Sequence, residues 1–595
     1  AWPPLPAGGA PRCEAPRVPQ GAPPLLSRPT RGVQGSAGAG AGAAPHGPAC
    51  LARRPRHPPF PLPLPRYHLI HLDPVRDAAV EPDRAALIQQ VREEREKRGM
   101  ARRARARGSQ AATPRAHRPT PTHPTPPLQR LLDLSDHISI EEFFEGWFHG
   151  APIATIKRDN VEEFIAYGFH CARLADLTDE ERCGVTTYVA RVEAKYGQRF
   201  GPGRNPDVRF MAHLWEPLRV LHKPLALHAL AEVMRLATDG ALWAAGFESG
   251  VTACGFRYWI KKGATASSDH PPSRPASAPA FALSTLGGLA RRRAALRSCD
   301  SASSLDAAAT GGAPSTDPDS APILFVHGVG LGLTPYLPLI LELSRLLPGR
   351  PVVLLEARHV SVGLAARAAS TDQVADAARA VLASHGWASA ACVGHSYGTF
   401  VLSRLAQAHP ATVQSLVLLD PVCMLTIYPQ LLQNFVYKPP TMAAGTRAAL
   451  AAVDSARFLF SRDLVVAEAF CRRFAWHREC LWPQDSPDGG RTLLALAAAD
   501  DLVPSALVRR VLAASRPDVR VAHHPTAGHG GILLHHRWRK EVLAAAADVI
   551  RTGAAHDRRV MATAAAARGV VVAGKHGSVI GAQPSPRADV TAAAA

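Results

Sequence analysis

The sequence predicts an α/β protein with a mostly parallel, doubly wound sheet, a helical region before it and disordered flanks. Between residues 319 and 552, short apolar runs alternate with helical stretches. Continuous apolar strands separated by helices indicate a parallel sheet that is buried on both faces. Elsewhere, much of the Pro (53 residues) and Gly (46 residues) lies in stretches without apolar periodicity. Such stretches bury too little surface to offset the entropy of ordering them, so one folded core is expected in the 595 residues.

Residues 1–129, which are rich in Pro, Gly and Ala and are basic, are expected to be disordered. Residues 1–130 contain 21 Lys and Arg but 8 Asp and Glu, whereas the two signs nearly balance over 319–552. The formal charge of +19 is therefore mostly a basic tail, which argues against specific nucleic-acid binding. Residues 1–72 carry eight Arg and one acid, Glu14, which suits either an organelle transit peptide or plain low complexity. The chain begins at Ala1 rather than Met, which leaves open a missing upstream segment.

Residues 130–248 are expected to be helical. Ser139 with Glu142 and Thr178 with Glu181 have the spacing of capping boxes, and Pro224 is expected to begin a third helix. Four aromatic residues lie at helical spacing: Phe143, Phe144, Trp147 and Phe148. This pattern favours side chains that pack in a core over a ligand site.

The remaining segments follow in order along the chain. Residues 249–263, which contain "FRYWIKK", are expected to form the first strand of the sheet. The Ser, Ala, Pro and Gly-rich segment 264–318 is expected to be a disordered insertion. Residues 319–552 are expected to form the folded domain with the mostly parallel sheet, and 553–595 a low-complexity tail.

A candidate nucleophile lies at the end of the third apolar run, in "AACVGHSYGTF". The run before Ser396 reads as a buried strand, and the segment after it has apolar residues at helical spacing. This strand–turn–helix pattern is typical of a nucleophile elbow, in which a strained turn raises the Ser396 hydroxyl above the sheet. The flanking Gly394 and Gly398 are needed where neighbouring elements leave no room for a Cβ atom.

A serine nucleophile requires a base, and the base requires an acid. His529 is the preferred base because it lies in a Gly-flanked loop after the last predicted strand. A metal site in this cluster is disfavoured. Four nearby histidines are expected on the strand or on the next helix: His523, His524, His535 and His536. Asp500 is the preferred acid over Asp501, and Asp420, at the end of "SLVLLD", stays open as a third candidate.

The segment "ILFVHGVGLGL" supplies a Gly-rich loop at a strand end. The backbone N–H of Val329 in this loop can pair with that of Tyr397 to form an oxyanion hole. A phosphate-binding loop is disfavoured, because no G-K-[ST] follows.

With the "HGVG" loop, the "GHSYG" elbow, the "DDLVP" loop and the "GH" base, residues 319–552 resemble serine hydrolases of the α/β-hydrolase superfamily. The resemblance implies an eight-stranded sheet, a Ser-His-Asp triad and a cap at about 421–485. Its many apolar and aromatic residues would either roof a substrate pocket or bury the cap against the sheet. "FFEGWFHGAPIATIKRDNVEEFIAYGF" and "LDPVC" also loosely resemble a little-characterised group of large fungal and algal α/β-hydrolases.

Two other classes of function remain open beside an esterase or lipase-like hydrolase. The fold could serve as a ligand-binding scaffold, or the same triad could transfer an acyl group to an alcohol or amine. We expect a small or lipid-like ester substrate, no cofactor and no metal.

The compartment is not determined by the sequence. The ten cysteines lack a C-x-x-C pair and favour reduced thiols and an intracellular location, with organelle targeting by the basic N-terminus left open. No run of 18 apolar residues occurs, so peripheral membrane contact is open but a spanning helix is not expected.

Overall fold

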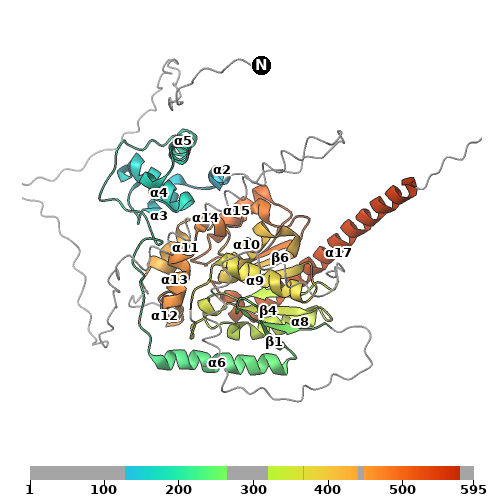
Figure 1. Cartoon of the computed structure of the whole chain (residues 1–595). Helices are drawn as coiled ribbons and strands as arrows, with labels where there is room; N and C mark the ends of the chain where they lie inside the picture. The colour runs from blue at the N-terminus through green and yellow to red at the C-terminus, as the bar shows by residue number, and fades with distance from the viewer. Residues whose placement is uncertain (1–126, 264–318, 366, 440–447, 576–595) are drawn as a thin grey trace, which may run out of the picture. The chain divides into compact units, whose positions relative to one another are not determined.

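The computed structural model describes residues 127–263, 319–365, 367–439 and 448–575 (Figure 1). All of them belong to one compact unit, Leu69–Ala595. The expected transit segment and the expected insertion 264–318 lie outside the described residues.

Eight strands form one sheet in the order β1-β2-β4-β3-β5-β6-β7-β8. The β1–β2 and β2–β4 pairs are antiparallel, and the other neighbouring pairs are parallel. The mostly parallel sheet predicted from the alternating pattern is therefore confirmed. The strands are β1 (Glu248–Val251), β2 (Arg257–Lys261), β3 (Ile323–Val326), β4 (Val352–Glu356), β5 (Ala390–His395), β6 (Val413–Leu419), β7 (Thr492–Ala497) and β8 (Arg520–His524).

The segment 249–263 differs from its prediction as one first strand. It holds the second strand, β2, and most of β1, which pair as an antiparallel hairpin. The reason for the miss is compositional, because β1 reads ESGV and is mostly exposed, without the apolar run that marks a buried strand.

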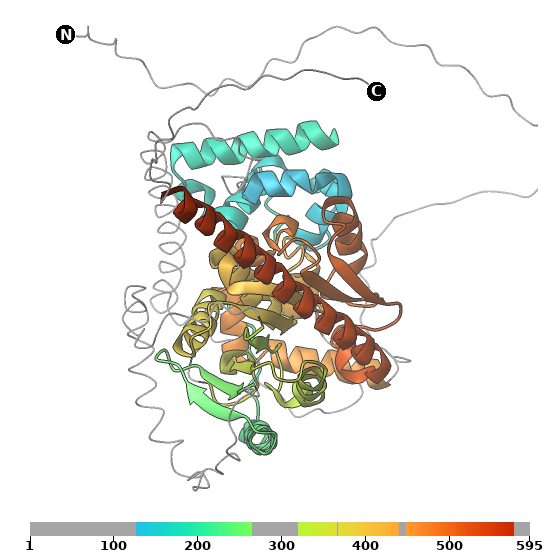
Figure 2. The same ribbon diagram turned by 90° about the vertical axis from the view of Figure 1, so that its right-hand side faces the viewer.

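Two apolar cores cover the two faces of the sheet. Alternate side chains of β3 divide between them, with Leu324 and Val326 in one core and Ile323 and Phe325 in the other. The first core includes α9 (Thr371–Ser384), α10 (Tyr397–Ala408) and α15 (Ser505–Ser515). The second includes α8 (Leu337–Leu346), α16 (Gly531–Leu534) and α17 (His536–Lys575), which crosses the sheet in Figure 2.

The helix α17 corrects the expected boundary at residue 552. It continues to Lys575, well into the segment expected to be a low-complexity tail. The physical reason is that an alanine-rich segment has high helix propensity, and α17 reaches it already nucleated by packing on the sheet.

The region before the sheet consists of α2 (Pro127–Asp133), α3 (Ile140–Trp147), α4 (Arg158–His170), α5 (Asp179–Tyr196) and α6 (Leu225–Ala244). Ser139 caps α3 by accepting the N–H of Glu142, and Thr178 forms a capping box with Glu181 at α5. Pro224 precedes the first residue of α6 as expected.

The cap lies between β6 and β7 and packs against this helical region. It contains α11 (Gln430–Leu432), a π-helix (Gln433–Tyr437), α12 (Ala448–Ser461), α13 (Leu464–Arg472) and α14 (Trp476–Glu479). The Trp147 indole, which is fully buried, donates its N–H to the carbonyl of Ile427 at 2.9 Å. Its ring lies 5.7 Å from that of Trp476, so α3 and the cap share one apolar core.

The cysteines only partly match the expectation of reduced thiols. Six described cysteines form no disulfide: Cys171, Cys183, Cys392, Cys423, Cys471 and Cys480. Cys254 is disulfide-bonded. Sequence spacing gave no signal for it, because disulfide pairing cannot be deduced from sequence alone.

Candidate active site

The candidate nucleophile Ser396 lies at the junction of β5 and α10. Its backbone has φ 50° and ψ −120°, an unfavourable conformation for a residue with a side chain. The helix starts at the next residue, so the turn is as sharp as the sequence pattern predicts.

The two glycines of the motif are required by close packing. A Cβ atom on Gly398 would lie 2.1 Å from the carbonyl oxygen of Val326 on β3. A Cβ atom on Gly394 would lie 2.8 Å from the Leu402 side chain on α10. Only glycine allows the strand, the turn and the helix to approach each other this closely.

His529 bridges the candidate nucleophile and the preferred acid. Its Nε2 lies 2.8 Å from Ser396 Oγ, and its Nδ1 lies 2.8 Å from Asp500 Oδ2. The residue belongs to the loop between β8 and α16, and it is followed by Gly530 at φ 75°. Three loops that are distant in sequence thus bring the three predicted side chains together.

Local hydrogen bonds distinguish Asp500 from Asp501. Asp500 accepts the backbone N–H groups of Leu502 and Val503 on Oδ1, at 2.8 Å and 2.9 Å, which leaves Oδ2 for His529. Asp501 is ion-paired with Arg457 of the cap. The structure therefore joins Asp500 to the base and directs Asp501 to the cap.

Asp420, the third candidate acid, takes a different position. It is fully buried at the end of β6 with φ 44°. Its Oδ2 accepts the N–H of Gly530 at 2.8 Å and lies 3.3 Å from Nε2 of His395. Asp420 therefore holds the residue after the base rather than the base itself.

A second buried network, which the sequence reasoning missed, lies beside these residues. The Tyr336 hydroxyl accepts the N–H of Gly328 at 3.0 Å and lies 2.7 Å from Nδ1 of His395. Because the Tyr336 oxygen accepts from Gly328, its own O–H donates to Nδ1 of His395. His395 then carries its proton on Nε2, and this N–H donates a hydrogen bond to Asp420. The only signal in the sequence is the position of His395 inside the elbow motif.

Charge in the site raises the proton affinity of His529. Burial by itself would lower the pKa of His529, but the charge and hydrogen bond of Asp500, with Asp420 and Asp501 adding, raise it above the ordinary value. Burial would likewise raise the pKa of Asp500, but His529 and the two backbone N–H groups hold it below the usual range. The acid is therefore ionised and its charge favours an imidazolium at His529.

The predicted oxyanion donors come from the loop after β3 and the first residue of α10. In the part of the chain that the structure describes, the N–H groups of Val329 and Tyr397 have no hydrogen-bond acceptor. The loop is anchored at Gly330, whose N–H binds the carbonyl of Val360 at 3.0 Å and whose carbonyl accepts the N–H of Val362 at 2.7 Å. A Cβ atom on Gly328 would lie 2.9 Å from Ser396 Cβ, so the loop directly adjoins the candidate nucleophile.

The other four histidines of the cluster lie elsewhere: His523 and His524 on β8 and His536 on α17, as the sequence predicts, and His535 between α16 and α17. His524 accepts the N–H of Ala527 at 2.9 Å and its ring contacts those of His535 and Trp538. His536 lies 3.7 Å from Glu342, and burial lowers the pKa of His523. None of these contacts reaches Ser396.

One group of potential metal ligands occurs at the site, which the spacing of the sequence does not indicate. Ligand atoms of Asp420, Asp500 and His529 lie within 4.8 Å of one another. The same carboxylates already hold the imidazole and the Gly530 N–H, so the arrangement is accounted for by hydrogen bonds alone.

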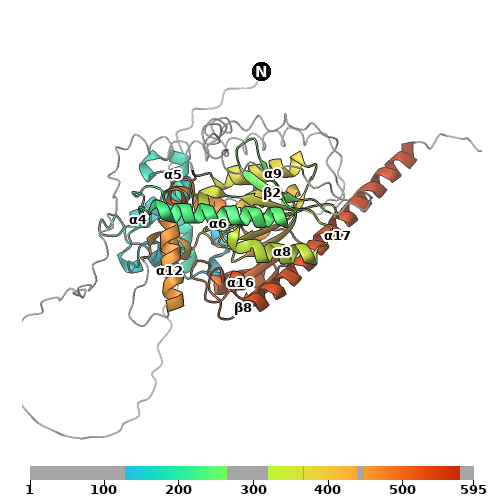
Figure 3. The same cartoon turned by 90° about the horizontal axis from the view of Figure 1, so that it is seen from below.

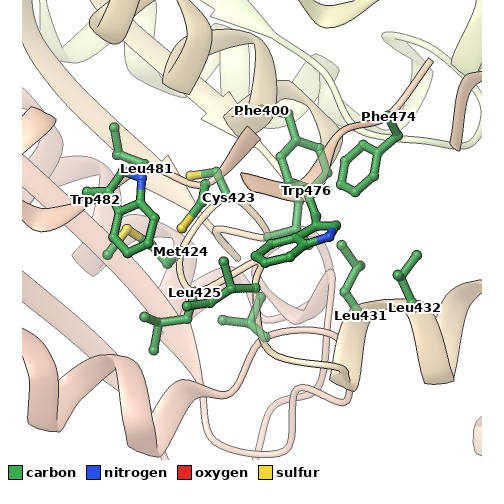
Figure 4. Close-up of a cluster of buried hydrophobic side chains, with 14 of the residues drawn as sticks. Phe400, Cys423, Met424, Leu425, Leu431, Leu432, Phe474, Trp476, Leu481 and Trp482 are labelled. Carbon is green, nitrogen blue, oxygen red and sulfur yellow. The ribbon is translucent and has the colours of Figure 1, made fainter. Parts of the chain in front are cut away.

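Aromatic residues of the cap approach the site from above α10. The ring of Phe470 on α13 lies 6.0 Å from Tyr397 and 4.7 Å from Phe435. Figure 4 shows Phe400 of α10 among cap side chains such as Phe474 and Trp476. Most of the predicted cap residues are thus buried in the core. Phe460 of α12 adjoins the predicted oxyanion loop, 3.5 Å from where a Cβ atom on Gly330 would be.

A family model agrees with the topology. Residues 321–461 match a family model described as the alpha/beta hydrolase fold. Similar solved structures include a bacterial membrane phospholipase A (15% identity, 55% of this chain and 94% of that chain, TM-score 0.30). A carboxylesterase of Nitrososphaera gargenis is also similar (15% identity, 40% of this chain and 92% of that chain, TM-score 0.29). So is the esterase LipW of Mycobacterium marinum (14% identity, 55% of this chain and 89% of that chain, TM-score 0.31). No curated protein sequence matches the chain. The family match over residues 321–461 and the strand order together show that this chain contains the α/β-hydrolase fold.

Proposed function

We propose that this protein is a serine hydrolase that cleaves carboxylic esters through an acyl-enzyme. The observation that carries the proposal is the position of His529, with one ring nitrogen 2.8 Å from Ser396 Oγ and the other 2.8 Å from Asp500. A nucleophile and base within hydrogen-bond reach, and an acid that orients the base, are the arrangement that nucleophilic catalysis requires.

Each residue has one role in the proposed reaction. Ser396 Oγ attacks the ester carbonyl as its proton passes to Nε2 of His529, and Asp500 stabilises the imidazolium. The N–H groups of Val329 and Tyr397 bind the oxyanion. Loss of one such donor typically raises the activation free energy by about 2.7–4 kcal/mol. His529 then protonates the leaving alcohol. In the second half of the reaction, His529 deprotonates a water molecule, which attacks the acyl-enzyme and releases the carboxylic acid.

The apolar cap supports an ester with an apolar acyl group. The side chains that adjoin the elbow and the oxyanion loop from the cap are aromatic, namely Phe470 and Phe460. A lipid ester or thioester belongs to this substrate class, and an acyl transfer would use the same triad with another acceptor.

A fluorophosphonate probe tests the proposal, because it labels an activated serine covalently. We expect labelling of the wild-type chain and turnover of p-nitrophenyl esters, with both lost by a factor of at least about 10³ in Ser396→Ala. Ser403→Ala on the same helix, α10, is the matched control and is expected to keep both. Labelling that survives in Ser396→Ala would refute the role of Ser396, and a folded wild type that neither labels nor turns over would favour a binding scaffold.

A further inference from the structure

The helix α6 has the reverse of the usual polarity for a surface helix. Its charged side chains face the protein. Glu232 pairs with Arg358 at 2.6 Å, and Asp239 pairs with Arg257 at 2.7 Å, while Arg235 on α6 joins both acids. These ion pairs attach α6 to β2 and to the segment after β4.

The outward face of α6 is apolar along its whole length. Its 20 residues extend over about 30 Å, and Figure 3 shows the helix lying along the outside of the domain. Every α6 residue in the exposed class is apolar: Leu225 (74% exposed), Leu230 (56%), Val233 (60%), Leu236 (42%), Trp243 (55%), with Ala226, Ala229, Ala237, Gly240, Ala241 and Ala244 between them. A surface helix of a soluble protein normally shows charged residues to water. A contiguous apolar face of this length marks a contact surface.

Two features favour a lipid surface as the occupant. Leucine, valine and tryptophan side chains on one face are the composition of helices that lie in a membrane interface. The chain also carries a formal charge of +19, most of it before residue 131, and this charge attracts an anionic bilayer and opposes close association of two copies. In the described part of the chain, no helix is both long and apolar enough to cross a bilayer, so the contact is with the surface.

The position of α6 connects this face to the cap. Just before the helix, Lys223 forms a buried ion pair with Asp463 at 2.8 Å, and the Leu221 N–H binds the carbonyl of Arg462 at 2.9 Å. Both partners lie in the cap at the end of α12 and the start of α13. The N-terminal end of α6 therefore lies beside the cap.

We propose that the apolar face of α6, Leu225 to Ala244, docks the protein on an anionic lipid surface. The inference stands on the exposed side chains and the charge of the chain, and it does not depend on ester hydrolysis. Docking beside the cap would present lipid-borne esters to the site without an additional membrane anchor.

Vesicle co-sedimentation of the full chain tests the proposal. The protein carries Ser396→Ala, so that lipid hydrolysis cannot alter the vesicles. It is mixed with vesicles of phosphatidylcholine alone or of phosphatidylcholine with phosphatidylserine. We expect binding to the anionic vesicles, and Val233→Glu should weaken it by at least about tenfold, because a charge replaces a side chain that enters the interface.

Val560→Glu is the matched control. Val560 is exposed to a similar extent (54%, against 60% for Val233) but lies on α17. This substitution adds the same negative charge without changing the α6 face, so it should leave binding within about twofold. Circular dichroism verifies that both variants fold.

Three results would overturn the proposal. The first is no sedimentation with either kind of vesicle. The second is equal weakening by Val233→Glu and Val560→Glu, which would assign binding to charge alone. The third is a doubled mass in light scattering that Val233→Glu abolishes, which would assign the face to a second copy of the chain. A failure of ester turnover would not affect any of these readings.

Discussion

The carboxylate of Asp420 acts on His529 through charge rather than through a hydrogen bond to its ring. Its hydrogen bonds go to the Gly530 N–H and to His395, yet its charge helps to raise the pKa of His529. The proposed base accepts a proton only when it is neutral, so activity is lost as the pH falls through this raised pKa. Asp420 is thus a positioning residue with an electrostatic effect.

Asp420→Asn is expected to move the acid limb of the pH profile of kcat/KM to lower pH. The substitution keeps an oxygen acceptor for Gly530 but removes one of the charges that raise the pKa of His529. The plateau should stay within about tenfold of wild type, because the Ser396–His529–Asp500 contacts are untouched. Turnover of a p-nitrophenyl ester over a pH series measures both quantities. Asp376→Asn on α9 is the control, and an acid limb that does not move in Asp420→Asn would contradict the electrostatic role.

At the scale of elements, the elbow depends on close contact between β3 and α10. Gly398 lies in the first turn of α10, where a Cβ atom would lie 2.1 Å from the carbonyl oxygen of Val326. The predicted oxyanion loop follows β3 directly, so a shift of β3 would displace it.

Gly398→Ala is expected to destabilise the protein by about 1–3 kcal/mol and to lower kcat/KM by a factor of at least about ten. The added methyl group forces α10 and its first N–H away from β3. Gly184→Ala is the control, because nothing lies within 4 Å of a Cβ atom at that helical position. It should be neutral or stabilising by up to about 1 kcal/mol. Urea unfolding gives the free energies, and equal values for the two variants would show that the close approach is not present.

Element prediction from the sequence succeeded where the pattern was strong. The strands with continuous apolar runs and the helices with capping residues are all in place, because burial on both faces and N-terminal capping leave local signals. The short exposed strand β1 and the extension of α17 were missed. Each owes its structure to a neighbour, β2 or the sheet, rather than to its own residues.

At the scale of the whole molecule, the helical region and the cap form one packed unit. Trp147 of α3 is central to it, with no exposed surface and an indole hydrogen bond to Ile427. The region before the sheet therefore packs against the cap, whose Phe470 ring lies 6.0 Å from Tyr397, the residue after Ser396.

Trp147→Ala is expected to cost about 3–5 kcal/mol of folding stability, the usual range for a buried Trp. It should also change the preference among p-nitrophenyl esters of rising chain length, since the cap loses its support. Trp243→Ala is the matched control, because Trp243 is 55% exposed and lies on α6. An unchanged chain-length profile in a destabilised Trp147→Ala would show that the cap is held by its other contacts.

The sequence by itself determined the fold class, the elbow at Ser396 and the order of the serine, acid and histidine segments, because each rests on local pattern. Only the tertiary structure decided which acid meets His529, since Asp500 and Asp501 are adjacent in the sequence. Backbone N–H groups hold Asp500 in place, whereas Arg457 pairs with Asp501. The tertiary structure also decided the positions of Asp420 and His395, and the outward direction of the apolar face of α6. Periodicity shows that a helix has two faces, but what packs against each face depends on residues far away in the chain.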